Sequence, residues 1–220
     1  SSPTLINLNV INNSADRYGG GIFISHCSPA PSLKGLKVIN NSTTIGHSGG
    51  GIMIDETNNL EFKNIEIINN YASDAGGIMC LGSQNILLDN VLMTNNVGDA
   101  GVINLLLNSS MQIINSSFYT NSSLSSSTYH FGIFNITEFS TLNVENSIFQ
   151  NNSPDFNNYG GGTYSVNYSN TNPIESGIGN IDSAPQFADS ANGDYTLVPG
   201  SPGVDAGNPD LNGNGISWQN

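Results

Sequence analysis

Short segments with apolar residues at alternate positions recur along the chain, and each closes on an asparagine. The closing asparagines return every 25 to 31 residues. A period of two is typical of β-strands, because successive side chains of a strand point to opposite faces. Six segments share the pattern: residues 7–13, 35–41, 64–70, 90–96, 115–121 and 146–152.

Two further short strands are expected in each repeat. One begins with glycine and follows the asparagine, at residues 21–24, 51–54, 77–80, 101–104, 132–135 and, more weakly, 162–165. The other precedes the asparagine-closed segment, at Leu5, Leu33, 60–62, 86–88, 111–113 and 142–144. Three short strands per repeat predict an all-β fold, a right-handed single-stranded parallel β-helix (solenoid) of about six coils that stack over one continuous core.

The alternation also predicts the side chains that face the core. In the asparagine-closed strands these are Leu8/Val10, Leu36/Val38, Ile65/Ile67, Val91/Met93, Ser116/Phe118 and Ser147/Phe149. Asparagine tolerates the left-handed backbone of a sharp corner, and stacked amides can hydrogen-bond along a column. We therefore expect one ladder at Asn7, Asn64, Asn90, Asn115 and Asn146, and another at Asn13, Asn41, Asn70, Asn96, Asn121 and Asn152.

The repeat decays after Asn152. We expect residues 1–165 to form the coils and residues 166–220 to form an irregular segment that packs on or beside the last coil. Such a segment covers the end of a solenoid and protects its strand edges.

Composition narrows the possible partners. The chain is 37% hydrophobic but only 10% charged, with a net charge of −13. Its basic residues all lie within the first 63 positions: Arg17, Lys34, Lys37 and Lys63. Binding to phosphate requires lysine and arginine, so nucleic acid and anionic membrane surfaces are poor partners, whereas glycans and divalent cations remain open. No apolar run reaches the ~18–20 residues of a membrane span.

The two cysteines do not indicate a redox compartment. The repeat register places Cys27 and Cys80 two coils apart, about 9–10 Å at the usual strand spacing, which exceeds the reach of a disulfide. Cys80 takes the position held by Ile24 and Ile54 in earlier coils, so we expect a small buried apolar side chain.

The end of the chain carries a resemblance to a known group of proteins. The motifs Ala-Pro-Gln-Phe at 184–187, Gly-Asp-Tyr-Thr-Leu-Val-Pro-Gly-Ser-Pro at 193–202 and Asp-Ala-Gly at 205–207 resemble the ending of secreted bacterial β-helix proteins of the pectin-lyase-like superfamily, the choice-of-anchor group. The sequence departs from that ending at Ala184, where aspartate is usual, and at Gly203. The Gly-Gly-Ile and Phe-x-x-Asn coils are similar to repeats of polymorphic outer-membrane autotransporters. The resemblance implies secretion or a cell-surface location and specifies no activity. Since the related endings continue further, it also implies that this sequence is a fragment and that the same polypeptide has further domains.

One cation site and one surface row are candidate sites. Asp210, Asn212 and Asn214 reproduce the opening of a calcium loop, D-x-N-x-N-G, and a solvated turn is the alternative. Calcium is the only cofactor that the sequence suggests. The corner before each glycine-led strand carries polar side chains that form a row if the coils align them: Asp16, Tyr18, His47, Asp74, Asp99, His130 and Tyr159. Such a row could bind a metal or a sugar, and the alternative is that these are ordinary exposed turn residues.

Two functions remain open from the sequence. The first is an extracellular or cell-surface module in adhesion, glycan contact or a structural stalk. The second is a polysaccharide-active enzyme with a lateral-groove site, in which Asp74 and Asp99 act with His47 or His130 nearby. The lyases of the superfamily use a basic arginine or lysine, and this chain has none after Lys63, so a hydrolase is favoured over a lyase.

Overall fold

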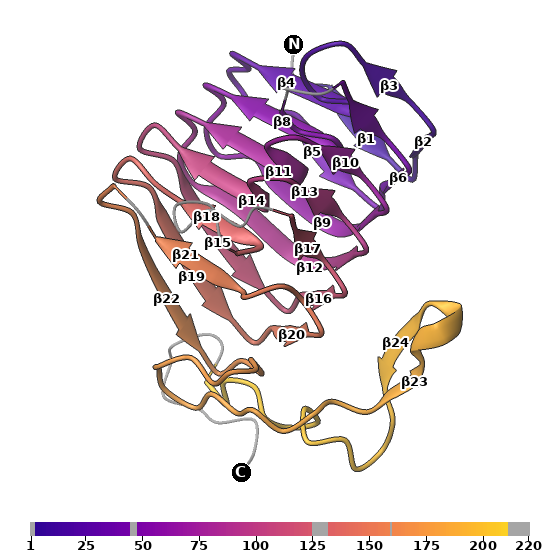
Figure 1. Ribbon diagram of the computed structural model, residues 1–220, viewed down its shortest axis with the longest axis vertical. Helices are drawn as coiled ribbons and strands as arrows, with labels where there is room; N and C mark the ends of the chain where they lie inside the picture. Colours follow the sequence, from indigo (N-terminus) through magenta and orange to yellow (C-terminus); the bar gives the residue numbers. More distant parts are fainter. Residues whose placement is uncertain (1–2, 45–47, 125–131, 159, 211–220) are drawn as a thin grey trace.

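The chain stacks into a parallel β-solenoid of about six turns. The computed structural model describes residues 3–44, 48–124, 132–158 and 160–210. Within them, strands of successive coils pair in parallel and build three sheets that run along the stack (Figure 1). The predicted all-β parallel fold is thereby confirmed.

The largest sheet has eleven strands and carries two of the three predicted columns. Its main path is β1 (Thr4–Ile6), β5 (Ser32–Lys34), β9 (Glu61–Ile68), β12 (Ile86–Thr94), β15 (Ser110–Ile114), β19 (Thr141–Glu145) and β22 (Thr163–Asn167). Beside this path lie β2 (Asn9–Ile11), β6 (Lys37–Ile39), β16 (Ser117–Tyr119) and β20 (Ile148–Gln150). In β9 and β12 the two columns form one strand that turns at Asn64 and Asn90, where φ is 55° and 56°.

The glycine-led column forms the six-stranded sheet. Its strands are β4 (Ile22–Ser25), β8 (Ile52–Asp55), β11 (Ala75–Leu81), β14 (Gly101–Leu106), β18 (Phe134–Ile136) and β21 (Phe156–Asn158). The prediction that residues 162–165 form the sixth strand of this column is wrong. Thr163–Asn167 pairs with β19, where Tyr164 lies beside Leu142 and Val166 beside Val144, so apolar stacking places it in the upstream column and β21 completes the glycine-led one.

A third sheet was not predicted from the sequence. Its five strands have two residues each: β3 (Ser14–Ala15), β7 (Ser42–Thr43), β10 (Tyr71–Ala72), β13 (Val97–Gly98) and β17 (Ser122–Ser123). They directly follow the closing asparagines, and two residues are too few to show an alternation in the sequence.

The predicted inward columns form the core. In the second to sixth coils all of these side chains are at most 2% exposed, from Leu36 and Val38 to Ser147 and Phe149. In the outermost coil Leu8 is 43% exposed, because stacking covers it on one side only. Toward the other end the core is aromatic: Phe118 stacks on Phe149 at 4.8 Å between ring centroids, and Phe134 stacks on Phe156 at 5.0 Å. Cys80 lies between Ile54 and Leu105 in its column, and both cysteines are free.

The ladder from Asn13 to Asn152 is continuous. From Asn41 to Asn152, each amide oxygen accepts bonds of 2.9–3.1 Å from the backbone N–H and the Nδ2 of the asparagine one coil earlier. From Asn41 onward, each Nδ2 also donates to a strand carbonyl at 2.7–3.1 Å. The left-handed residue of this corner is the preceding one, with φ of 53–59°: Asn12, Asn40, Asn69, Asn95, Thr120 and Asn151.

The outer ladder is discontinuous. Asn64, Asn90, Asn115 and Asn146 all adopt left-handed φ, as the corner requires. Asn90 donates to Asn64 at 2.7 Å and Asn146 to Asn115 at 3.5 Å, but Asn115 donates to Asp89 instead of Asn90. These amides lie on the surface of the corner, and the structure shows no continuous chain of hydrogen bonds along them.

The last part of the chain covers the aromatic end of the stack. Asn170 bridges Ile148 on one side and Ile181 on the other, which continues the parallel stacking. The hairpin of β23 (Phe187–Asp189) and β24 (Asp194–Leu197), joined by the 3-10 turn Ser190–Asn192, then projects beside the coils (Figure 1). The domain division at residue 165 remains a prediction. Among the described residues, no helix has the length and apolar character needed to cross a bilayer.

Candidate functional site

The corner row predicted from the sequence is aligned only in part. Tyr18 bridges Ser48, and the Ser48 hydroxyl donates to the Asp74 carboxylate. Since Ala75 pairs with Gly101, the residue that stacks on Asp74 is Ala100, and Asp99 lies one position away, beside Ser73. His47, His130 and Tyr159 lie outside the described residues, and the catalytic and binding roles of the row remain predictions.

Asp16 lies at the start of this corner, away from the Asp74 column. Its backbone carbonyl accepts the Thr44 hydroxyl at 2.5 Å, and its side chain is exposed. The expected calcium loop is described only at Asp210, whose N–H donates to Asn208 Oδ1 at 2.9 Å, because Asn212 and Asn214 lie outside the described part. Within the ranges that the structure describes, no group of three histidine, cysteine, aspartate or glutamate side chains could hold a metal. Calcium binding therefore remains a prediction.

A groove on the side of the solenoid is a feature that sequence reasoning missed. Two adjoining cavities of about 260 Å³ and 380 Å³ lie between the eleven-stranded sheet and the C-terminal hairpin. Both are lined by Asn115, Ser117 and Tyr195, so they form one continuous depression, which we call the lateral groove.

The floor of the lateral groove consists of outward side chains of stacked strands. Register places Glu66 beside Leu92, Leu92 beside Ser117 and Ser117 beside Ile148. The outer ladder runs along this floor and contributes its amides: Asn64, Asn90, Asn115 and Asn146. The floor thus alternates short polar groups with aliphatic surface along the axis of the stack.

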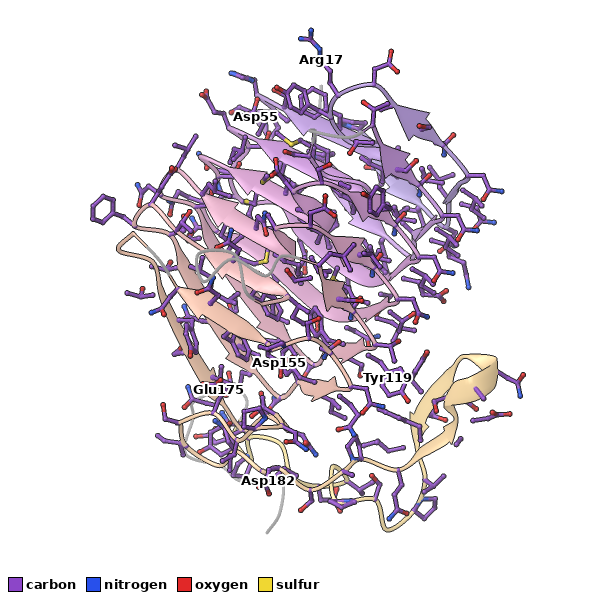
Figure 2. The ribbon with its side chains drawn as sticks, in the orientation of Figure 1. Arg17, Asp55, Tyr119, Asp155, Glu175 and Asp182 are labelled. Carbon is purple, nitrogen blue, oxygen red and sulfur yellow. The ribbon has the colours of Figure 1, made fainter. Side chains whose placement is uncertain are left out.

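The opposite wall is the hairpin, which an aromatic cluster holds in place. Tyr119 of β16 meets Phe187 at 5.6 Å and Tyr195 at 5.2 Å between ring centroids, and these two rings meet each other at 5.5 Å. Figure 2 shows Tyr119 on the side of the stack that faces the hairpin. The pairs of Phe187 with Tyr119 and with Tyr195 are edge-to-face, and such a pair contributes about 0.5–1.5 kcal/mol beyond area burial. Further along, the Asn208 N–H donates to Asn146 Oδ1 at 2.7 Å and ties the segment to the outer ladder.

The charged groups of the lateral groove are carboxylates. Glu66 pairs with Lys37 at 2.8 Å at the edge of the floor. Hydrogen bonds from the Thr196 side chain and backbone lower the pKa of Asp194, which keeps this carboxyl ionised. Among the described residues that line the two cavities, none is lysine or arginine. The groove therefore presents amides, hydroxyls, apolar surface and negative charge.

A second missed feature is a buried carboxyl group near the end of the core. Asp155 is 8% exposed, and its Oδ1 has no hydrogen-bond partner. Burial, reinforced by the Glu175 charge, raises its pKa to about 7, although a hydrogen bond with Asn152 opposes the shift. Glu175 accepts the Tyr164 hydroxyl at 3.1 Å. Figure 2 shows Asp155 and Glu175 at the aromatic end of the stack.

Comparison with known proteins agrees with this geometry. The family described as "Right handed beta helix region" matches residues 1–177. Neither the curated proteins nor the solved structures contain a match to the chain. A β-helix is consistent with a surface or carbohydrate-related module, and the match specifies no activity. On the extent of this match and its stacked parallel coils, the chain belongs to the right-handed β-helix family.

Proposed function

We propose that this protein is an extracellular or cell-surface module that binds a glycan in the lateral groove. The observation that supports the proposal is the position of the C-terminal hairpin, which packs through Tyr195 and Tyr119 beside the outer asparagine ladder. The hairpin thereby encloses a flat strand face as the lateral groove. Extracellular placement is supported by the resemblance of residues 180–210 to the endings of secreted β-helix proteins.

The lining matches the chemistry of a sugar. Amides both donate and accept hydrogen bonds, as the hydroxyl groups of a sugar ring require. Tyr195, Leu92 and Ile148 provide apolar surface for the faces of the ring, in keeping with sites that combine apolar walls and a few placed polar groups. Because the charged groups among the described lining residues are carboxylates, the groove favours neutral glycans and repels uronates.

Two substitutions test the groove directly. Tyr195→Ala removes the ring that lines both cavities, and Asn115→Gly removes an amide while glycine keeps the left-handed φ of 52°. Asn69→Gly is the matched control, because Asn69 has a φ of 54° and is exposed outside the groove. We expect neutral oligosaccharides to bind the parent protein and Asn69→Gly equally, and to bind Tyr195→Ala and Asn115→Gly at least tenfold more weakly.

The assay combines a glycan array with calorimetry and a reducing-sugar measurement. Equal binding by all four proteins, or preferential binding of uronates, contradicts the proposed groove. Release of reducing ends that Asp74→Asn abolishes supports the hydrolase hypothesis instead. Binding without turnover supports a module that contacts glycans.

A further inference from the structure

We propose that the open face of the first coil, built by β1 to β4, binds the same face of a second copy of this chain, so that two solenoids meet end to end. This face lies at the opposite end of the stack from the C-terminal segment (Figure 1). Neither the repeat pattern nor the family match assigns it a role, and its function does not depend on glycan binding in the lateral groove.

All three sheets end at the first coil with an open strand edge. Within the described ranges, β1, β2, β3 and β4 pair only with strands of the second coil. The N–H groups of Asn7 and Asn12 donate to that coil at 3.0 Å. Backbone groups point to alternate sides along a strand, so the N–H groups of Ile6 and Ile11 point away from the stack. Such an edge is a template for pairing with another chain.

Exposed apolar side chains gather on the same coil. Of the twelve large apolar side chains that are exposed in the described part of the chain, five lie here, each 40–52% exposed: Ile6, Leu8, Ile11, Tyr18 and Phe23. At roughly 200 Å² per side chain they present about 450 Å², which is in the range of the largest apolar patches on monomeric proteins. A stable interface buries about 800 Å² per partner, so the strand edges and polar side chains of the coil supply the rest.

The shape of this face selects another coil as its partner. Leu8 points inward between the open edges, so a single added strand would pair with one edge and leave Leu8 uncovered. Another coil presents three edges around an apolar centre and continues the interface that joins the coils of the stack. The far end of the stack is already covered by the chain itself, through Asn170 and Ile181. The matching surface is therefore the first coil of a second copy, related by a two-fold axis.

The charge distribution favours this face for self-association. The chain has a net charge of −13, so most surfaces of two copies repel each other. Residues 1–31 contain one acidic residue, Asp16, and one basic residue, Arg17, and carry no net charge with histidine neutral. Two copies that meet at their first coils therefore keep the negative remainder of each chain away from the interface.

Sedimentation equilibrium of the full chain at micromolar concentrations tests the assignment. We expect a dimer of twice the 23.2 kDa chain mass. Phe23→Lys and Leu8→Lys place a charge on the open face, which opposes edge-to-edge pairing and should weaken dimerisation at least tenfold. Phe139→Lys is the matched control, because Phe139 is 75% exposed in a turn of a later coil, and this variant should dimerise like the parent.

Hydrogen exchange supplies an independent measurement, and far-ultraviolet circular dichroism confirms that each variant keeps the parent fold. In the parent, the amides of Ile6 and Ile11 should exchange more slowly as the protein concentration rises. A monomeric parent, equal dimerisation by Phe23→Lys and the parent, or exchange that does not depend on concentration overturns the proposal. A monomer would identify a further coil of the same polypeptide, or a different protein, as the partner of this face.

Discussion

The substitution Asp155→Asn should stabilise the protein above neutral pH. Asp155 is almost completely buried, its Oδ1 lacks a partner, and its pKa is raised from 3.8 to about 7, chiefly by burial. Between these two pH values the unfolded chain binds fewer protons than the folded chain, so stability falls as the pH rises through the window. Asparagine has nearly the same shape and carries no charge.

The size of the effect follows from the pKa. A rise of roughly three units corresponds to about 4 kcal/mol, as each unit is worth about 1.4 kcal/mol. Below pH 4 both proteins hold a neutral side chain at position 155 and should have similar stability. Above pH 7 the variant should exceed the parent by up to about 4 kcal/mol, a large fraction of the stability of a typical domain.

Urea unfolding from pH 4 to pH 9, followed by circular dichroism, measures the difference between the two proteins. Asp182→Asn is the control, because Asp182 is exposed on the C-terminal segment (Figure 2), and the curve of this variant should parallel that of the parent. Glu175→Gln should reduce the pH dependence, since Glu175 reinforces the raised pKa of Asp155. A difference between Asp155→Asn and parent that does not grow with pH would refute the reasoning.

Three further predictions test the fold and its surface. Asn70→Ala leaves the buried N–H of Asn41 and the Val38 carbonyl without their partners, so it should lower the free energy of unfolding by roughly 3–5 kcal/mol in a denaturant titration. Asn64→Gly keeps the left-handed corner and removes an exposed amide, so it should cost less than about 1 kcal/mol. Equal costs for the two variants would contradict a structural role of the buried ladder. Phe118→Ala should lower the free energy of unfolding by about 3–5 kcal/mol, because the ring is 1% exposed and stacks on Phe149. Tyr18→Ala, at an exposed side chain, is the comparison, and an equally small cost for both variants would disprove the role of Phe118 in the core. Lys37→Ala should change stability by less than about 1 kcal/mol and by still less in high salt, because its pair with Glu66 is exposed, and a larger loss would mean that this pair is structural.

The core could be predicted from the sequence because stacking repeats one constraint in every coil. Apolar residues in phase, such as Val38 and Ile67, can be buried together only if the coils lie in register. The same logic placed Cys80 in the column of Ile54. It failed at 162–165, where a glycine suggested one column but the apolar pair Tyr164 and Val166 determined another.

The candidate sites were harder to predict because they depend on outward positions. The lateral groove had no signal in the repeat pattern. Its wall depends on Tyr195 reaching Tyr119, a contact between segments that share no repeat and no register.

This contrast explains where function is expected in such a molecule. Inward positions repeat because each side chain must match those above and below it in a close-packed column. Outward positions in the same strands carry no such requirement, and along one column they read Lys37, Glu66, Leu92, Ser117 and Ile148. A repeating core thus supports a surface that differs at every strand spacing. The lateral groove combines this non-repeating column with the amides of the outer ladder. The outward columns beside the hairpin, and not the buried asparagines, are therefore where substitutions should alter binding while the fold is retained.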